Sequence, residues 1–268
     1  MLVSYHVHST NSDGSNTIPE LVEAAVDLGL DEIGVSDHFV YPVPGRPVDW
    51  SMAPDKLDSY FNQLEQAREI AGGRIRLRFG LECDYEPQTA GALASVLKEY
   101  TLDYVIGSMH FLDEFPIDSR AEDWEKLAQP ERDEMVRAYW DRIVGLAKSR
   151  VFDIVGHIDL CKKFGYQPTI DLSREIEAAV DAIARSGMAI EINTSGLHVP
   201  AREMYPSKAI LGECLARAIP ILITSDAHTC ADLTRGFDQA ARLAAEAGCT
   251  ETVVFEGRKM SRVPILSI

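Results

Sequence analysis

The chain has 268 residues, of which 46% are hydrophobic and 25% are charged. This composition is ordinary for a globular protein with a sizeable core, and the length suits one large domain or two ordinary ones. The 26 basic and 42 acidic side chains give a formal net charge of -16. Surfaces that bind nucleic acids gather Lys and Arg, so this balance argues against a nucleic-acid partner.

Targeting signals and cysteines bear on where the protein works. No apolar run approaches the ~20 residues needed to span a bilayer. We therefore expect no membrane partner, and no signal peptide before the first strand. The five cysteines are odd in number, scattered, and form no C-x-x-C pair. They are typical of reduced thiols, which predicts a cytoplasmic protein without disulfides.

Short β-rich runs alternate with longer amphipathic runs along the chain. "PELVEAAVDLGL" (19–30) and "REIEAAVDAIARSG" (174–187) carry apolar residues at helical spacing and a Gly near the end, which indicates helices. Repetition of strand, helix and strand predicts a parallel sheet, and at this length a closed α/β barrel in one domain, residues 1–268. The predicted strands are 2–8, 32–36, 75–81, 102–108, 151–157, 187–193 and 219–225, with a less regular eighth candidate at 251–257.

Loop lengths differ between the two ends of the predicted barrel. Helix-to-strand links such as 27–32 are short, whereas the strand-to-helix links 39–54, 111–130 and 194–207 are long. Barrel enzymes carry their sites on the loops at the carboxyl ends of the strands, so we expect the site there. Trp50 in the first long loop either closes over that site or belongs to an ordinary packed loop.

Residues of the kind that bind metals concentrate at the carboxyl ends of the predicted strands. His6 and His8 alternate at the end of the first strand and therefore project to the same side. A lone histidine would more often be an ordinary hydrogen-bonded residue, but six of the seven share this placement. Imidazoles mixed with carboxylates suit Zn, Mn or Fe, and so many ligands require two or three ions. The nine candidate ligands are His6, His8, Asp13, His38, Glu82, His110, His157, Asp226 and His228.

Seven segments occur in this order along the chain: "HVHSTNSDG", "SDH", "GLECDY", "DYVIGSMHFL", "GHIDLCKKFG", "EINTSGL" and "SDAH". Together they resemble the PHP superfamily (polymerase and histidinol phosphatase), and specifically its histidinol-phosphate phosphatases. The resemblance runs from residue 3 to about residue 240. It implies a distorted (β/α)7 barrel of parallel strands with a trinuclear metal site at the carboxyl ends of the strands.

The resemblance also implies how three ions share the ligands, with Glu82 bridging two of them. Many relatives in this branch place a histidine shortly after the H-x-H pair, where this chain offers only Asp13. An aspartate in "SDG" could instead merely cap a turn. The implied sets are His6, His8, Glu82 and Asp226 for the first ion, Glu82, His110 and His157 for the second, and Asp13, His38 and His228 for the third.

The activity implied is hydrolysis of a small phosphorylated substrate, L-histidinol phosphate, to L-histidinol and phosphate in histidine biosynthesis, by a metal-bound hydroxide. Asp226 and His228 are the candidates for the acid that protonates the leaving alkoxide. Arg202 is the first candidate for a phosphate contact because a guanidinium fork suits phosphate oxygens. For each charged loop residue, a solvated rim position is an equally good interpretation. The other candidate substrate contacts are His198, Lys162 and Lys163.

Three alternative functions remain open at this point. The first is a PHP-type phosphoesterase that acts on nucleotides or other small phosphate esters. The second is a C–N hydrolase of the amidohydrolase type, which usually uses a carboxylated lysine inside the barrel, whereas no predicted strand shows an inward lysine. The third is a non-catalytic relic, which the full set of nine ligands argues against.

Overall fold

The computed structural model describes residues 1–265, so the last three residues of the predicted domain, 266–268, lie outside the described residues. Seven parallel strands form one sheet in the order β1-β2-β3-β4-β7-β8-β9. They are β1 (Val3–Ser4), β2 (Glu32–Val35), β3 (Arg76–Asp84), β4 (Tyr104–Ser108), β7 (Ile154–Val155), β8 (Ala189–Asn193) and β9 (Ile221–Thr224).

The first and last strands of this sheet meet and nearly close it into a barrel. Val7 and Ala227 form a parallel bridge just beyond β1 and β9. The amide of His8 donates to the carbonyl of Ala227 at 2.8 Å, and the amide of Ala227 donates to the carbonyl of His6 at 2.9 Å. The predicted distorted (β/α)7 barrel is therefore confirmed.

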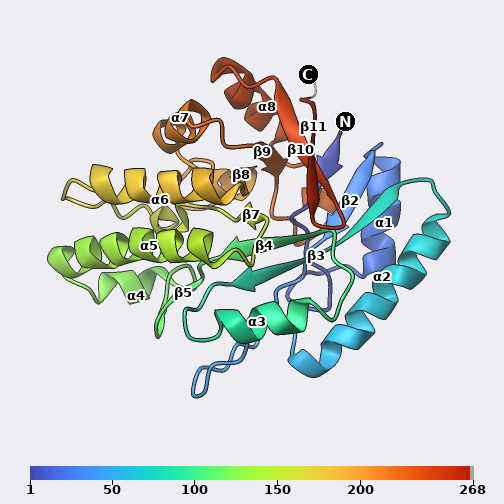
Figure 1. Ribbon diagram of the computed structural model, residues 1–268, viewed down its shortest axis with the longest axis horizontal. Helices are drawn as coiled ribbons and strands as arrows, with labels where there is room; N and C mark the ends of the chain where they lie inside the picture. Colours follow the sequence, from blue (N-terminus) through green and yellow to red (C-terminus); the bar gives the residue numbers. More distant parts are fainter. Residues whose placement is uncertain (266–268) are drawn as a thin grey trace.

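Helices surround the barrel, with α1 and α2 on one flank and α5 and α6 on the other (Figure 1). Among residues 1–265, no helix combines the length and apolar character needed to cross a lipid bilayer. The helices are α1 (Ile18–Asp27), α2 (Leu57–Ala71), α3 (Ala90–Leu97), α4 (Ala121–Glu125), α5 (Gln129–Ser149), α6 (Ser173–Ser186), α7 (Lys208–Ala216) and α8 (Phe237–Glu246), with short 3-10 turns η1 (Pro54–Lys56), η2 (Leu160–Lys162), η3 (Thr194–His198) and η4 (Cys230–Asp232).

The two helices predicted from sequence periodicity have clear start and stop signals. The α1 helix starts at a capping box in which the Glu20 carboxylate accepts the Thr17 amide at 2.8 Å. The α6 helix ends at Gly187, whose left-handed φ of 80° suits a residue without a side chain. Both predictions, 19–30 and 174–187, are confirmed to within a few residues.

The candidate eighth strand at 251–257 does not join the barrel, so that expectation is wrong. Its residues form β10 (Glu251–Glu256), which pairs antiparallel with β11 (Lys259–Pro264) in a separate hairpin. Val253 and Phe255 are buried in a cluster with Tyr5 and Tyr104 at the amino end of the barrel. The apolar residues of 251–257 therefore close the floor of the barrel rather than extend its wall.

The three long loops all follow barrel strands and gather at the carboxyl end. Loop 111–130 contains the small hairpin of β5 (Phe111–Leu112) and β6 (Phe115–Pro116). It is anchored by the fully buried Trp124, whose indole nitrogen donates to the carbonyl of Ile117 at 2.8 Å. A cavity of about 480 Å³ opens between these loops, at the end where the sequence predicted the site.

Candidate metal centre

Glu82 is the centre of the polar cluster at the carboxyl end of the barrel. It lies near the end of β3, and its carboxylate is completely buried. Ser108, on the neighbouring β4, donates its hydroxyl to Glu82 Oε1 at 2.5 Å. Five imidazoles surround the carboxylate, with ring nitrogens at 2.7 Å (His38), 3.0 Å (His157), 3.1 Å (His6), 3.5 Å (His8) and 3.6 Å (His110).

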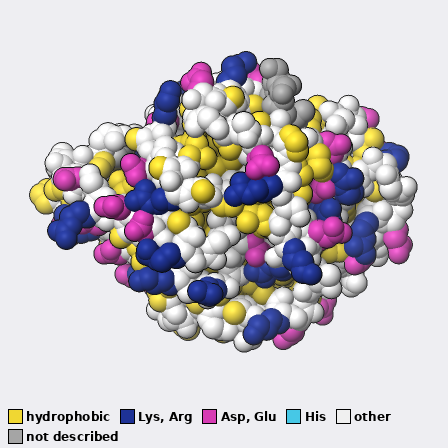
Figure 2. All heavy atoms as spheres, turned by 45° about the horizontal axis from the view of Figure 1, so that its top comes forward, with side chains coloured by type: hydrophobic (Ala, Val, Ile, Leu, Met, Phe, Trp, Pro, Cys, Tyr) yellow, Lys and Arg dark blue, Asp and Glu magenta, His cyan; other side chains and the backbone are white. Residues whose placement is uncertain are grey.

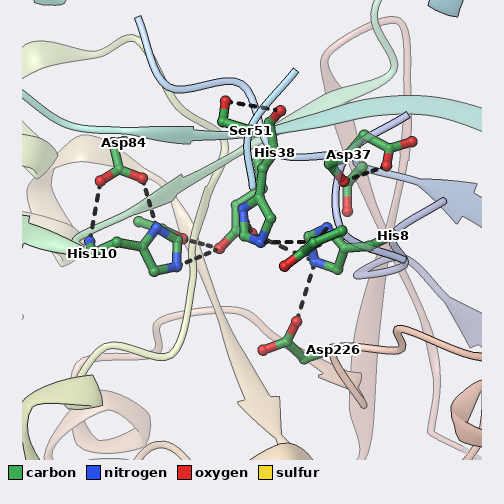
Figure 3. A network of polar contacts seen from close by, with 12 residues as sticks. His8, Asp37, His38, Ser51, Asp84, His110 and Asp226 are labelled. Carbon is green, nitrogen blue, oxygen red and sulfur yellow. Dashed lines mark hydrogen bonds and ion pairs between the residues drawn. The ribbon is translucent and has the colours of Figure 1, made fainter. Parts of the chain in front are cut away.

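All nine predicted ligands fall into four overlapping groups whose ligand atoms lie within 4.8 Å of one another. The grouping differs from the implied sets, because His157 joins His6 and Glu82, and His110 joins His38 and Glu82. Figure 3 shows His8, His38 and His110 converging from different strands, with Asp226 close to His8. The groups are His8, Asp13, His38 and His228; His6, Glu82 and His157; His6, His8 and Asp226; and His38, Glu82 and His110.

Unpaired buried atoms test whether this cluster fits metal ions. His6 Nε2 and Glu82 Oε2 are buried and face each other at 3.1 Å, but neither makes a hydrogen bond among the described residues. Buried polar atoms in proteins are nearly always satisfied, so such a pair indicates that a cation belongs between them. Imidazole nitrogens with carboxylate oxygens are the donor set that Zn, Mn and Fe accept. The residues therefore fit divalent ions.

Burial and neighbouring charges also favour the ligand forms of two central residues. Burial alone would raise the pKa of the Glu82 carboxyl, but the surrounding imidazoles hold that pKa well below its usual range. Burial, together with His38 and His228, lowers the pKa of His8 to about 3. An ionised carboxylate and a neutral imidazole are the forms that bind metals.

Asp13 lies beside three imidazoles, and its side chain is 32% exposed. Its carboxylate oxygens are 3.3 Å from His228 Nε2, 3.6 Å from His38 Nε2 and 4.0 Å from His8 Nδ1. Although burial opposes it, the hydrogen bond to His228 and the other two imidazoles lower the pKa of Asp13 to about 2. Asp13 therefore lies beside His38 and His228, the other two residues predicted to bind the third ion. That it binds an ion remains a prediction.

The turn after His8 is held by a different aspartate. Asp37 accepts hydrogen bonds from the amide and hydroxyl of Ser9 at 2.8 and 2.6 Å, and from the hydroxyl of Ser12 at 2.5 Å. The carbonyl of Ser9 accepts the amides of Ser12 and Gly14 within the turn. The sequence left open that Asp13 only caps this turn. In the structure, Asp37 makes the side-chain hydrogen bonds that stabilise it.

Two further carboxylates orient the predicted ligands, and the sequence reasoning missed both. Glu191 on β8 lies 2.8 Å from His6 Nδ1 and also accepts the amide of His157 at 2.6 Å. Asp84 on β3 lies 2.6 Å from His110 Nδ1 and accepts the amide of the same histidine at 3.2 Å (Figure 3). Carboxylates of this kind fix the ring orientation of metal-binding histidines. Strand alternation could have found Asp84, which shares a strand face with Glu82.

Two of the four predicted substrate contacts line the cavity above the cluster, and two do not. Lys163 and His198 line it, together with Arg235, which sequence reasoning did not select. Arg235 follows the "SDAH" motif, and Asp232 holds one corner of its guanidinium at 2.7 Å. The other lining residues outside the nine candidate ligands are Trp50, Asp118, Ser119, Leu160, Ser195, Val199 and Tyr205.

Arg202 and Lys162 are not among the residues that line the cavity, and their role as substrate contacts stays a prediction. Arg202 is exposed, with a left-handed φ of 50°, and its guanidinium reaches only the carbonyl of Leu197 at 3.5 Å. Lys162 is engaged by Asp159 at 2.9 Å and Glu203 at 2.8 Å. Proximity in sequence to His157 could not reveal these ion pairs.

Trp50 packs directly over the cluster from loop 39–54. Its ring centre lies 4.7 Å from that of His38 and 5.2 Å from that of His110, and it stacks on Phe111. Arg46 secures the same loop by pairing with Glu86 at 2.6 Å, with both side chains buried. The loop therefore forms one wall of the site.

Comparisons with known proteins agree with this geometry. The family model described as the PHP domain matches residues 4–195. A probable histidinol-phosphatase of Deinococcus radiodurans is 32% identical, over 97% of this chain and 98% of that protein. A histidinol-phosphatase of Bacillus subtilis is 27% identical, over 87% of this chain and 96% of that protein.

A solved structure shares the fold over almost the whole chain. It is the histidinol phosphate phosphatase of Lactococcus lactis subsp. lactis complexed with zinc, L-histidinol and phosphate, which superposes with a TM-score of 0.82 at 22% identity. The likeness covers 97% of this chain and 98% of that one. With most of the chain matched by the family model and a full-length relative above 30% identity, this protein belongs to the PHP family.

Proposed function

We propose that this protein is a phosphoric monoester hydrolase that converts L-histidinol phosphate to L-histidinol and phosphate, a step of histidine biosynthesis. The observation that carries the proposal is the buried Glu82 carboxylate ringed by five imidazoles, three of which (His38, His110 and His157) line an open cavity. Full-length likeness to proteins named histidinol-phosphatase supports the substrate. The five cysteines are free, which agrees with a reaction in the cytoplasm.

The nine clustered residues would hold three divalent ions, of Zn, Mn or Fe. Glu82 is the proposed bridge, because its two oxygens face different imidazoles. Asp13, His38 and His228 are the proposed ligands of the third ion, and the structure brings them together with His8. When bound, such ions neutralise a phosphate dianion and lower the pKa of water so that it can attack phosphorus.

The remaining steps fall to residues that line the cavity. Arg235 and Lys163 provide the positive charges proposed to hold the phosphate oxygens, in place of Arg202 and Lys162. Asp226 and His228 also line the cavity and are the proposed donors of a proton to the leaving alkoxide. Trp50 covers His38 and His110 and limits the access of bulk water to the cluster.

Phosphate release from a substrate panel tests the proposal. The purified protein, loaded in turn with Mn, Zn or Fe, would be given L-histidinol phosphate, nucleoside monophosphates and a cyclic nucleotide. We expect the highest kcat/KM for L-histidinol phosphate. Equal or faster release from nucleotides would contradict the proposed substrate while leaving a phosphatase.

The main competing function is a phosphoesterase for nucleotides or other small phosphate esters. One relative is the DNA polymerase/3'-5' exonuclease PolX of Bacillus subtilis, 26% identical over 83% of this chain but only 33% of that protein. The net charge of -16 disfavours a polymeric substrate, because phosphate backbones are held by clustered Lys and Arg. On the face shown in Figure 2, where the histidines of the cavity are not visible, Lys and Arg are scattered among Asp and Glu.

A further inference from the structure

One carboxylate in the cavity has no part in the chemistry described so far. Of the acidic residues that line the cavity among residues 1–265, Asp13 and Asp226 are proposed ligands, whereas Asp118 is not. Lys163 pairs with it at 3.0 Å, and Arg235 lines the same cavity. A site that binds only a phosphate dianion gains nothing from an added negative charge, so Asp118 requires another explanation.

The position of Asp118 is fixed by its buried neighbour. Ile117 is fully buried, its amide donates to the carbonyl of His110 at 2.8 Å, and its carbonyl accepts the indole N–H of Trp124. Asp118 therefore follows a segment bonded directly to the backbone of a proposed metal ligand. Its side chain lines the same cavity as His110.

Only one oxygen of Asp118 is occupied by the protein. Lys163 Nζ donates to Oδ2 at 3.0 Å, and no described residue donates a hydrogen bond to Oδ1. The Asp118 side chain is 22% exposed, and that of Lys163 is 26% exposed. The ion pair thus presents both a negative and a positive charge to the cavity, which suits a ligand that itself carries both signs.

We propose that Asp118 binds the ammonium group of the substrate and selects phosphate esters of 2-amino alcohols. This inference rests on the proposed function, because L-histidinol phosphate carries an ammonium two carbons from its ester oxygen. Asp118 lines the same cavity as the proposed ligands His38, His110 and His228, and the proposal places the ammonium against Asp118 when the phosphate is at the ions. The free Oδ1 then accepts a charge-assisted hydrogen bond from the ammonium, while Lys163 remains on Oδ2.

The test compares L-histidinol phosphate with its deamino analogue, 3-(imidazol-4-yl)propyl phosphate. The variants are Asp118→Asn, Lys163→Met and, as a matched control on the same loop, the exposed Glu114→Gln. In Asp118→Asn we expect KM for L-histidinol phosphate to rise about 10- to 100-fold, the usual effect of losing one charge-assisted hydrogen bond. The deamino analogue should change less than about twofold on the same grounds, since it never made the contact.

A positioning role for Asp118 gives a different result. If the carboxylate only orients Lys163, then Asp118→Asn and Lys163→Met should weaken both substrates equally, and the proposal is overturned. Calorimetric binding of L-histidinol gives a readout independent of turnover, and Asp118→Asn should weaken it while Asp118→Glu restores part of it. Wild-type protein inactive on both esters would instead refute the proposed function, and the inference with it. Unchanged values in Glu114→Gln exclude a general effect of losing an acidic residue from this loop.

Discussion

The two ends of the barrel bury carboxylates in opposite ways. At the amino end, Glu32 of β2 accepts hydrogen bonds from Arg76 at 2.7 Å and Arg78 at 2.9 Å, and also from the hydroxyl of Tyr5. At the carboxyl end, Glu82 of β3 has imidazoles in place of permanent cations. The charge on Glu32 is therefore balanced by permanent cations, whereas the charge on Glu82 faces imidazoles, which bind a metal ion in their neutral form.

This difference separates a structural cluster from a binding site. The amino end is closed by β10, which buries Val253 and Phe255 against Tyr5 and Tyr104. The carboxyl end is open, and buried atoms such as His6 Nε2 and Glu82 Oε2 make no hydrogen bond among residues 1–265. Removal of a carboxylate should therefore cost folding stability at one end and metal content at the other.

The largest effect is expected from Glu82→Gln compared with Glu32→Gln. The amide keeps the shape of each side chain but removes its charge. We expect Glu82→Gln to lose at least one metal equivalent and about 10³-fold or more in kcat, because the proposed bridge between two ions is gone. Glu32→Gln should keep its metals and lose about 1–3 kcal/mol of unfolding free energy.

Elemental analysis, phosphate release and urea unfolding measure the three quantities. Full metal content with near-normal turnover in Glu82→Gln would remove the bridging role. Metal loss of similar size in Glu82→Gln and Glu32→Gln would show that the two ends are coupled through folding. The distinction between a structural amino end and a metal-binding carboxyl end would then be wrong.

A smaller effect should follow from changing a carboxylate that orients a ligand. Glu191→Gln weakens the hold on His6 Nδ1 but leaves every proposed ligand in place. Partners of this kind typically contribute 10- to 100-fold in metal affinity or activity, so we expect a loss of about that size. Titration of the metal-free protein with Zn²⁺ or Mn²⁺ measures it. An unchanged affinity would make Glu191 a purely structural residue of β8.

The sequence predicted the barrel and the cluster for a physical reason. Strand order and alternation place chain-distant residues such as His6 and Asp226 at the same end of a parallel barrel, so topology alone assembles the ligands. The family resemblance then implied three ions, a number that stays a prediction. Burial of a carboxylate such as Asp84 beside Glu82 follows from the same alternation, although it was not used.

Loop side chains could not be placed in the same way. Arg202 and Arg235 are both arginines in segments that follow barrel strands, but only Arg235 lines the cavity. The outcome depends on local backbone, including the left-handed conformation at Arg202, and on partners such as Asp232. The hairpin of β10 and β11 was missed because its alternation is equally typical of a barrel strand.

Asp13, a proposed ligand of the third ion, can be tested in the same way. We expect Asp13→Asn to lower the occupancy of one ion and weaken phosphate binding about tenfold, while Asp13→His restores both in part. Metal analysis and inhibition by inorganic phosphate measure the two effects. The matched control is Ser12→Ala, which removes a contact of the turn to Asp37 but no proposed ligand. Full metal occupancy in Asp13→Asn, with a loss of stability like that of the control, would reduce Asp13 to a turn residue.

The last comparison concerns two arginines in the loops around the cavity. Arg235 lines the cavity with its guanidinium held by Asp232, whereas Arg202 is exposed and reaches only a backbone carbonyl. Loss of a charge-assisted contact costs about 1.5–3 kcal/mol, so Arg235→Ala should raise KM for L-histidinol phosphate about 10- to 150-fold. Arg202→Ala should change KM less than about twofold, because a solvated side chain contributes little to binding.

Steady-state kinetics and thermal unfolding of both variants show which of the two arginines contributes to substrate binding. A larger effect on KM in Arg202→Ala than in Arg235→Ala would mean that loop 194–207 moves onto the substrate, and it would return Arg202 to the role that the sequence first suggested.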